Sequence, residues 1–200
     1  MRLSRIALAA LSGYLTGTIP SSDVAARLAS GGAVDLRAAG SGNPGGANAA
    51  KVLGARWGYG VMAADIGKGV FAARAGRRLA GDAGQHVGAV AAVVGHCWPV
   101  WNGFRGGKGV SCSVGQCLST FPAYFPVDLG VAAVAAAGPW RERAFVATAA
   151  SSAVWVAGAT LWWRRSWPNG WGGRPTAGLP LAAAASSLVI LDRFRRGRAA

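Results

Sequence analysis

Two glycine-rich segments of this 200-residue sequence combine the residue types that bind phosphate. The first reads GSGNPGGAN over residues 40–48 and is followed by Lys51, and the second reads HCWPVWNGFRGGKG over residues 96–109. Glycine lets backbone N–H groups approach an oxyanion closely, and a helix that begins after such a loop adds a favourable dipole. A lysine or arginine then neutralises the phosphate charge. Both segments therefore predict anion binding.

Neither segment is a standard nucleotide motif. Gly40, Gly42 and Gly45 match the spacing of a dinucleotide-binding loop, but the polar residues before them do not predict the buried strand that such a loop follows. The second segment is similar to a P-loop, but Gly109 stands where a serine or threonine would hold magnesium. Plain flexible connection is the alternative, since the chain has 31 glycines. Because each loop also carries a lysine, phosphate binding is favoured.

The elements that must position these loops are apolar and helical. Hydrophobic residues make up 52% of the chain and charged residues only 14%, against about 25% charged in ordinary soluble domains. Apolar blocks alternate with short basic or glycine-rich segments, which is typical of several membrane spans. We expect an all-α, polytopic integral membrane protein forming one domain over residues 1–200, with about five to seven transmembrane helices, some short or broken.

The apolar blocks can be placed along the chain. They cover residues 3–24, 57–73, 87–104, a block after residue 109, 144–163 and 179–191. Pro20 predicts a kink in the first block, and Pro122 and Pro126 predict two short helices in the fourth. The polar segment over residues 27–56 is too long and too polar to span. Asp65 and Lys68 are three residues apart, so they can pair on one helical face.

The net charge of +14 comes from 21 Lys and Arg against 7 Asp and Glu. Because the basic residues lie between apolar blocks, we expect lipid headgroups and phosphate-bearing substrates as partners, and no nucleic acid. Cys97, Cys112 and Cys117 form no C-x-x-C pair and no zinc pattern, so we expect free thiols and no metal.

The two loops resemble the motifs of the bacterial integral-membrane acyl-phosphate:glycerol-3-phosphate acyltransferases. The family's first motif is close to GSGNPGATN followed by a basic residue, and its second is close to GH-x-(W/F)PV-x-x-x-F-(K/R)GGKGV. The second is matched almost completely by GHCWPVWNGFRGGKGV. GTIPSS at residues 17–22 and DIGKG at residues 65–69 add further agreement. The resemblance covers residues 13–115 in order and spacing.

This resemblance implies a multi-helix fold in the plasma membrane with the motif loops facing the cytoplasm. It implies acyl transfer from acyl phosphate to the sn-1 hydroxyl of glycerol 3-phosphate, without a cofactor. Lys108, His96 and Ser41 are the implied catalytic residues, with a structural hydrogen bond as the alternative for His96. The implied substrate-binding residues are Gly40, Gly42, Asn43, Gly45, Asn48, Lys51, Lys68, Arg105, Gly106, Gly107 and Gly109.

Departures from the family pattern concern the acceptor. Ala47 replaces a threonine and Lys51 an arginine, and Thr148 or Ser151 are the nearest substitutes for a serine in a late helix. The third motif, a histidine and an asparagine three apart before basic residues, is reduced to LVILDRFRRGRAA at residues 188–200. Its arginines, Arg193 and Arg195 among them, would contact phosphate or the membrane surface. A different acceptor, a catalytically impaired lipid-phosphate-binding protein and an anion transporter are the alternative functions.

Overall fold

The computed structural model describes residues 2–197, so the last three residues of the basic C-terminal segment lie outside it. Within that range the chain is all-helical and has no strand. The elements in order are α1 (Arg2–Gly17), α2 (Ser21–Ser30), α3 (Gly46–Leu53), α4 (Ala55–Cys97), the 3-10 turn η1 (Val100–Asn102), α5 (Val110–Thr120), α6 (Phe125–Ala137), α7 (Arg143–Arg165) and α8 (Gly178–Arg196).

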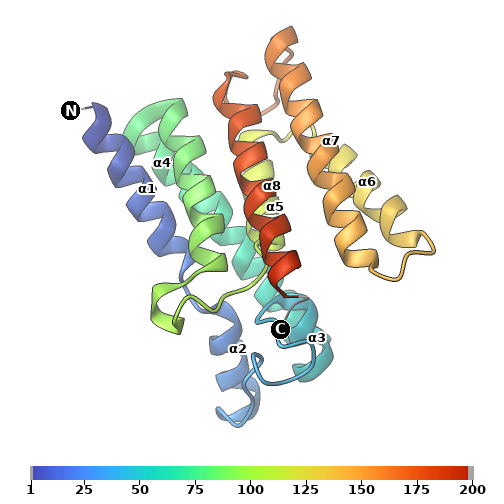
Figure 1. The fold of residues 1–200 in the computed structure, drawn as a ribbon. Coiled ribbons are helices and arrows are strands. Elements are labelled where there is room, and N and C mark those ends of the chain that lie inside the picture. The colour runs from blue at the N-terminus through green and yellow to red at the C-terminus, as the bar shows by residue number, and fades with distance from the viewer. Residues whose placement is uncertain (1, 198–200) are drawn as a thin grey trace.

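The predicted first block is two helices. α1 ends at Gly17, and α2 begins at Ser21 directly after Pro20. Proline has no N–H to continue a helix and disfavours helical geometry in the residue before it, so the chain breaks here and does not merely kink. Together with α3 and the loop over residues 98–109, α2 forms one end of the molecule, which we call the motif end (Figure 1).

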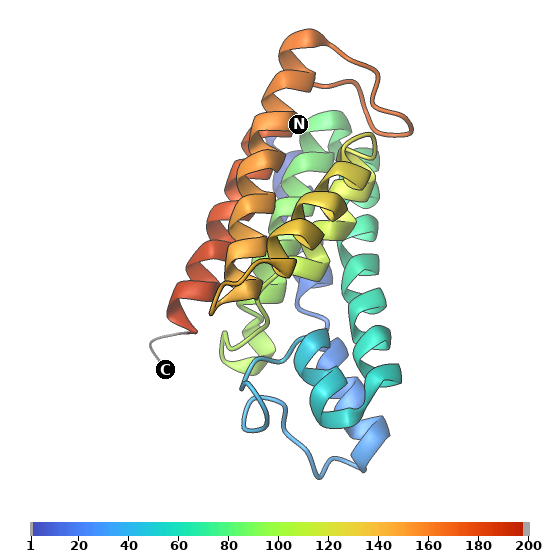
Figure 2. The same cartoon turned by 90° about the vertical axis from the view of Figure 1, so that its right-hand side faces the viewer.

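The longest element, α4, is a helical hairpin. Its 43 residues are interrupted at Ala80 and Gly81, and Gly81 takes a left-handed φ of 63°. The arms before and after this break run antiparallel (Figures 1 and 2). A Cβ on Gly76 would meet the backbone of Gly84 in the facing arm, so glycine allows the close turn. The blocks predicted at residues 57–73 and 87–104 are thus joined, and the second arm ends at Cys97 because Pro99 cannot continue it.

Small residues bring α1 and α5 against α4. A Cβ on Gly17 would meet the backbone of Ala92, and one on Gly69 would meet the backbone of Cys112 in α5. In lipid, where apolar side chains gain little from contacting one another, such close backbone approach is a main source of helix association. The alanine and glycine content of the sequence therefore fixes a tight three-helix packing around α4.

The remaining helices, α6, α7 and α8, form a second layer beside this core. α5 and α6 separate around Pro122, as the proline positions predict, and α7 and α8 follow as two long helices (Figure 2). By length and hydropathy alone, α7 is the only helix within residues 2–197 that qualifies as a membrane span. The outer face of α1 nevertheless carries large exposed apolar side chains. They are Leu3, Leu8, Leu11 and Leu15.

Candidate functional site

The first glycine loop is closed around Asn48. This side chain is 2% exposed; its Oδ1 accepts a hydrogen bond from the Ser41 N–H (2.8 Å), and its Nδ2 donates to the carbonyls of Leu36 (3.0 Å) and Ala39 (2.9 Å). Gly40 takes φ 62° beside it, where any side chain would collide with the Asn48 amide. Both amide hydrogens of Asn48 are therefore used to shape the loop.

This loop leads into the N-terminus of α3. Gly42 takes a left-handed φ of 68°, and Gly45 precedes the first helical residue. Ser41, Asn43 and residues 45–48 then line a large cavity, and so does Lys51 from the last turn of α3. The N-terminus of a helix carries partial positive charge and backbone donors, so this side of the cavity favours an anion.

The second loop folds back over the end of α4. The N–H of Gly106 donates to the Cys97 carbonyl (3.1 Å), and the N–H of Gly107 donates to the His96 carbonyl (3.1 Å). The carbonyls of the same two glycines accept hydrogen bonds from Arg193, at 2.8 Å for Gly106 and 3.2 Å for Gly107. These glycine N–H groups, expected to bind phosphate, thus satisfy the last turn of α4.

Arg193 has a role that the sequence did not indicate. Its guanidinium bridges two carbonyls of the second loop from α8. Arg195, two residues on, is exposed. Between the loop and α8, the Lys108 ammonium lies 4.1 Å from the centre of the Phe194 ring. The C-terminal helix therefore holds the loop that carries Lys108.

Lys108 and the start of α5 line the same large cavity as α3. Gly109 caps α5 with φ 88°, and Gly109, Val110 and Ser111 all contribute to the cavity wall. The cavity has a volume of about 610 Å³. Two helix N-termini and two lysines therefore line the motif end of one cavity, which we call its opening. This arrangement suits two phosphate groups.

A buried ion pair stands behind the opening. Asp65 and Lys68 are 1% and 6% exposed, and the Lys68 ammonium donates to the Asp65 carboxylate at 2.7 Å, as their spacing predicts. The same ammonium donates to the Ser21 hydroxyl (2.9 Å) and to the Ile19 carbonyl. An ammonium has three hydrogens, so those of Lys68, an expected substrate contact, are all used within the protein. The pair fixes the turn between α1 and α2 on α4.

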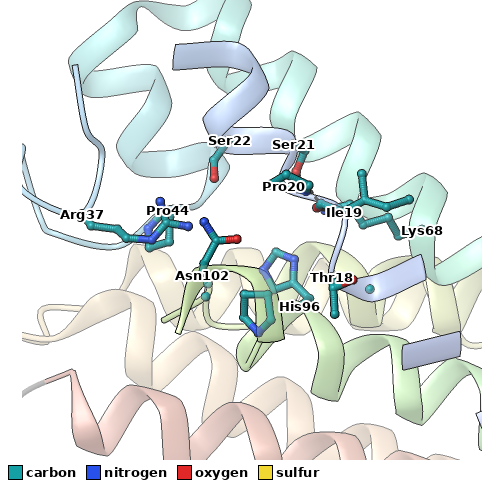
Figure 3. Close-up of a pocket in the computed structure, with 14 residues that line it drawn as sticks. Thr18, Ile19, Pro20, Ser21, Ser22, Arg37, Pro44, Lys68, His96 and Asn102 are labelled. Carbon is teal, nitrogen blue, oxygen red and sulfur yellow. Dashed lines mark hydrogen bonds between the residues drawn. The ribbon is translucent and has the colours of Figure 1, made fainter. Parts of the chain in front are cut away.

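His96 lies between two cavities. It is 8% exposed, and its Nδ1 is 3.6 Å from an Asp65 carboxylate oxygen. It lines the large cavity and also a small cavity of about 20 Å³ under the α1–α2 turn (Figure 3). Gly107 packs directly on its Nε2 side, where a Cβ would collide with the ring. The imidazole is thus held on both sides.

A polar latch that the sequence did not reveal ties α2 to both loops. Arg37 donates to the two Asp23 carboxylate oxygens at 2.7 and 3.2 Å, and to the Arg105 carbonyl at 2.9 Å. The Asn102 amide donates to Asp23 at 2.8 Å (Figure 3 shows Arg37 and Asn102). Arg105, expected to bind substrate, is exposed and lines neither cavity. Scattered polar residues of ordinary spacing give no sequence signal for such a latch.

From the opening, the cavity continues between α5, α6, α7 and α8. Thr148 and Ser151, the residues considered as substitutes for the late-helix serine, both line it. Ser151 donates a hydrogen bond to Asp128 of α6. Ala47, which stands in place of a threonine, lines the cavity at the motif end.

Known proteins are similar to this chain in sequence. The family model for glycerol-3-phosphate acyltransferase matches residues 7–197. A glycerol-3-phosphate acyltransferase of Gloeobacter violaceus is 43% identical over 126 residues, covering 60% of this chain and 59% of that relative. One of Symbiobacterium thermophilum is 37% identical over 152 residues, covering 76% of this chain and 74% of that relative. The chain thus spans about three fifths to three quarters of the length of these relatives.

The fold is also known. The structure of PlsY (YgiH), an integral membrane glycerol 3-phosphate acyltransferase, in its glycerol 3-phosphate form matches 97% of this chain and 90% of its own, with a TM-score of 0.76 and 24% identity. Its lysophosphatidic acid form gives a TM-score of 0.75 at 23% identity. The expectation of an all-α integral membrane fold is therefore confirmed.

Proposed function

The chain belongs to the glycerol-3-phosphate acyltransferase family, and from this premise we propose that it transfers a fatty acyl group from acyl phosphate to the sn-1 hydroxyl of glycerol 3-phosphate. The products are lysophosphatidate and inorganic phosphate. One observation carries the proposal: the N-termini of α3 and α5, with Lys51 and Lys108, line one cavity. Both substrates carry a phosphate, so two cationic sites in one cavity match the pair.

The two sides of the opening take different phosphates. On the α3 side, Ser41, Asn43 and the first amides of the helix hold glycerol 3-phosphate, with Lys51 completing the charge. On the α5 side, Lys108 and the amides after Gly109 face the acyl phosphate. Gly40 and Gly42 serve this arrangement by bending the loop, Gly45 leads into α3 in an extended conformation, and Asn48 holds the loop closed.

The chemical step is a displacement at the acyl carbon. The glycerol hydroxyl oxygen bonds to that carbon, the bond from the carbon to the phosphate oxygen breaks, and phosphate leaves with the electron pair. Lys108 and the α5 N-terminus stabilise the negative charge that develops on the acyl and phosphate oxygens. The hydroxyl proton goes to the leaving phosphate, whose pKa is about 6 by analogy with phosphoserine.

His96 positions the site in this mechanism. Its imidazole contacts Asp65 on one side and packs on Gly107 on the other. It therefore sets the distance between the second loop and the end of α4. Lys68 acts similarly through the α1–α2 turn. Gly106 and Gly107 contribute through the backbone bonds that set the direction of Lys108.

We further propose that the chain resides in the plasma membrane with the motif end toward the cytoplasm. Glycerol 3-phosphate is a small dianion that does not cross a bilayer unaided, so the opening must face the compartment that supplies it. The exposed leucines of α1 support a lipid-facing exterior.

The experiment uses the purified protein with acyl phosphate and labelled glycerol 3-phosphate, and measures labelled lysophosphatidate. Lys108→Ala is expected to lower turnover by about 100-fold or more, as for removal of a donor to a developing oxyanion. Arg56→Ala is the control, because Arg56 is exposed and lines neither cavity. If acyl phosphate binds but no product forms, the chain is a lipid-phosphate-binding protein and not an acyltransferase. Product formed only with another acceptor would overturn the choice of glycerol 3-phosphate.

A further inference from the structure

The large cavity has two chemically different ends. At the motif end it is lined by Ser41, Lys51 and Lys108. Its middle is lined mainly by small or aliphatic residues of four helices: Val110, Val114, Ala132, Ala136, Ala144, Ala147 and Ile190. Ser113 and Thr148 also line it, but their hydroxyls donate hydrogen bonds to carbonyls of their own helices. At the far end stand Trp155 and the hydrogen-bonded pair of Asp128 and Ser151. The apolar space is therefore bounded at both ends.

One face of α7 runs the length of this space. The residues of α7 that line it recur at helical spacing and are Ala144, Ala147, Thr148, Ser151, Ser152 and Trp155. From Ala144 to Trp155 the helix rises about 16 Å at about 1.5 Å per residue. One leaflet of a bilayer has a hydrocarbon thickness of about 15 Å, half of the whole core. The cavity is thus as deep as one membrane acyl chain.

Trp155 closes the far end as part of a packed cluster. It is 6% exposed and packs in one cluster with Phe121, Tyr124, Ala159 and Leu179. The Phe121 and Tyr124 rings stack with centroids 5.0 Å apart. A chain longer than the cavity would have to displace a close-packed indole, and close-packed interiors do not yield easily.

The polar groups at this end add a second barrier. The Asp128 carboxylate is partly buried and faces Ser151 across the cavity wall. The Trp155 Nε1 is buried without a hydrogen-bond partner among the described residues. A methylene that contacts these polar groups would exclude water from them without offering a hydrogen bond, which is unfavourable. An apolar chain therefore gains nothing by extending past this end of the cavity.

Resting on the proposed use of acyl phosphate, we propose that Trp155, together with the Asp128–Ser151 pair one turn below it, is the stop that sets the acyl-chain length this enzyme accepts. The chain enters at Lys108, runs along the alanines of α6 and α7, and its methyl end meets the indole. Trp155 determines the selectivity for acyl-chain length and takes no part in the chemical step.

The test is a competition among even-numbered saturated acyl phosphates with glycerol 3-phosphate as acceptor, with the products resolved by mass. In Trp155→Ala the preferred length moves to longer chains, and the share of product longer than the wild-type optimum rises about tenfold or more, since a methylene that gains or loses its pocket changes selectivity about 10- to 200-fold. Ala147→Trp, on the same face but nearer the opening, moves the preference to shorter chains.

Val154→Ala is the matched control, because Val154 neighbours Trp155 in sequence but is exposed and does not line the cavity. Trp155→Phe, which keeps most of the packing, gives an intermediate shift and covers the case in which the alanine variant does not fold. An unchanged chain-length profile in both Trp155 variants overturns the inference and leaves the acyltransferase in place. A wild-type protein that turns over no acyl phosphate of any length overturns the proposed function instead.

Discussion

At the scale of single residues, Ala47 offers a direct test of how the acceptor is bound. It lies in the first turn of α3 and lines the cavity, where a threonine would present a hydroxyl to a phosphate. A hydrogen bond to a charged group contributes about 1.5–3 kcal/mol, so Ala47→Thr is expected to lower the KM for glycerol 3-phosphate about 10-fold or more with little change in kcat. Ala55→Thr, exposed and outside both cavities, serves as control. An unchanged KM would mean that the first turn of α3 does not bind the phosphate of glycerol 3-phosphate.

The buried pair of Asp65 and Lys68 provides a test of stability. Asp65→Asn leaves the Lys68 ammonium buried without its counter-charge, and breaking a buried pair in this way destabilises by about 3–5 kcal/mol. We expect the melting temperature in detergent to fall by about 10 °C.

The double variant Asp65→Leu/Lys68→Met removes both charges and should recover most of that loss, because no charge remains buried. Equal melting temperatures for wild type and Asp65→Asn would show that Ser21 and Ile19 alone can satisfy Lys68.

The sequence was enough to single out the important residues, but not the hydrogen-bond partners of each one. The spacing of Asp65 and Lys68 was enough to predict their ion pair, which the structure confirms; the anion site at the glycine loops stays a prediction. Which donors remain available depends on contacts with residues distant in sequence. The Lys68 ammonium is used by the α1–α2 turn, and the Gly106 N–H by the end of α4. Such long-range hydrogen bonds leave no periodic pattern to read.

At the scale of helices, α8 controls the second loop through Arg193. Arg193→Ala removes the hydrogen bonds to the carbonyls of Gly106 and Gly107. The loop can then move, and the Lys108 side chain is no longer held in position. Because a misplacement of about 1 Å can lower a rate about 100-fold, we expect kcat to fall by about 10- to 100-fold while the KM for glycerol 3-phosphate changes little.

Arg193→Lys should rescue only partly, since an ammonium lacks the planar fork that spans two carbonyls. Arg195→Ala is the matched control on the same helix. A loss confined to KM would mean that Arg193 contacts the acceptor and does not position the loop.

Helix positions were predictable where proline or hydropathy marks them, as at Pro122 and along α7. The two arms of α4 were predicted as separate blocks, but the position of their turn was not, because the turn at Gly81 needs only two residues and lies among arginines and alanines that continue a helix well. Likewise, glycine and alanine give weak hydropathy, although they are the residues that let α1 approach α4.

At the scale of the whole molecule, charge does not decide the orientation in the membrane. The end opposite the motif end carries Arg164, Arg165 and Arg174, and the motif end carries Lys51, Lys108 and further arginines. The positive-inside rule needs an asymmetry between the two sides, and here both are basic. The orientation proposed above therefore rests on access of substrate to the cavity.

Cysteine labelling can test this orientation, because Cys97, Cys112 and Cys117 are all buried and give little background. Arg174→Cys places a thiol at the far end, and Arg56→Cys places one at the motif end; both positions are exposed. With a membrane-impermeant maleimide, intact cells should label Arg174→Cys and spare Arg56→Cys, and permeabilised cells should label both. The reverse pattern would put the phosphate-binding opening outside the cell, where an enzyme that uses a cytoplasmic phosphate ester could not work.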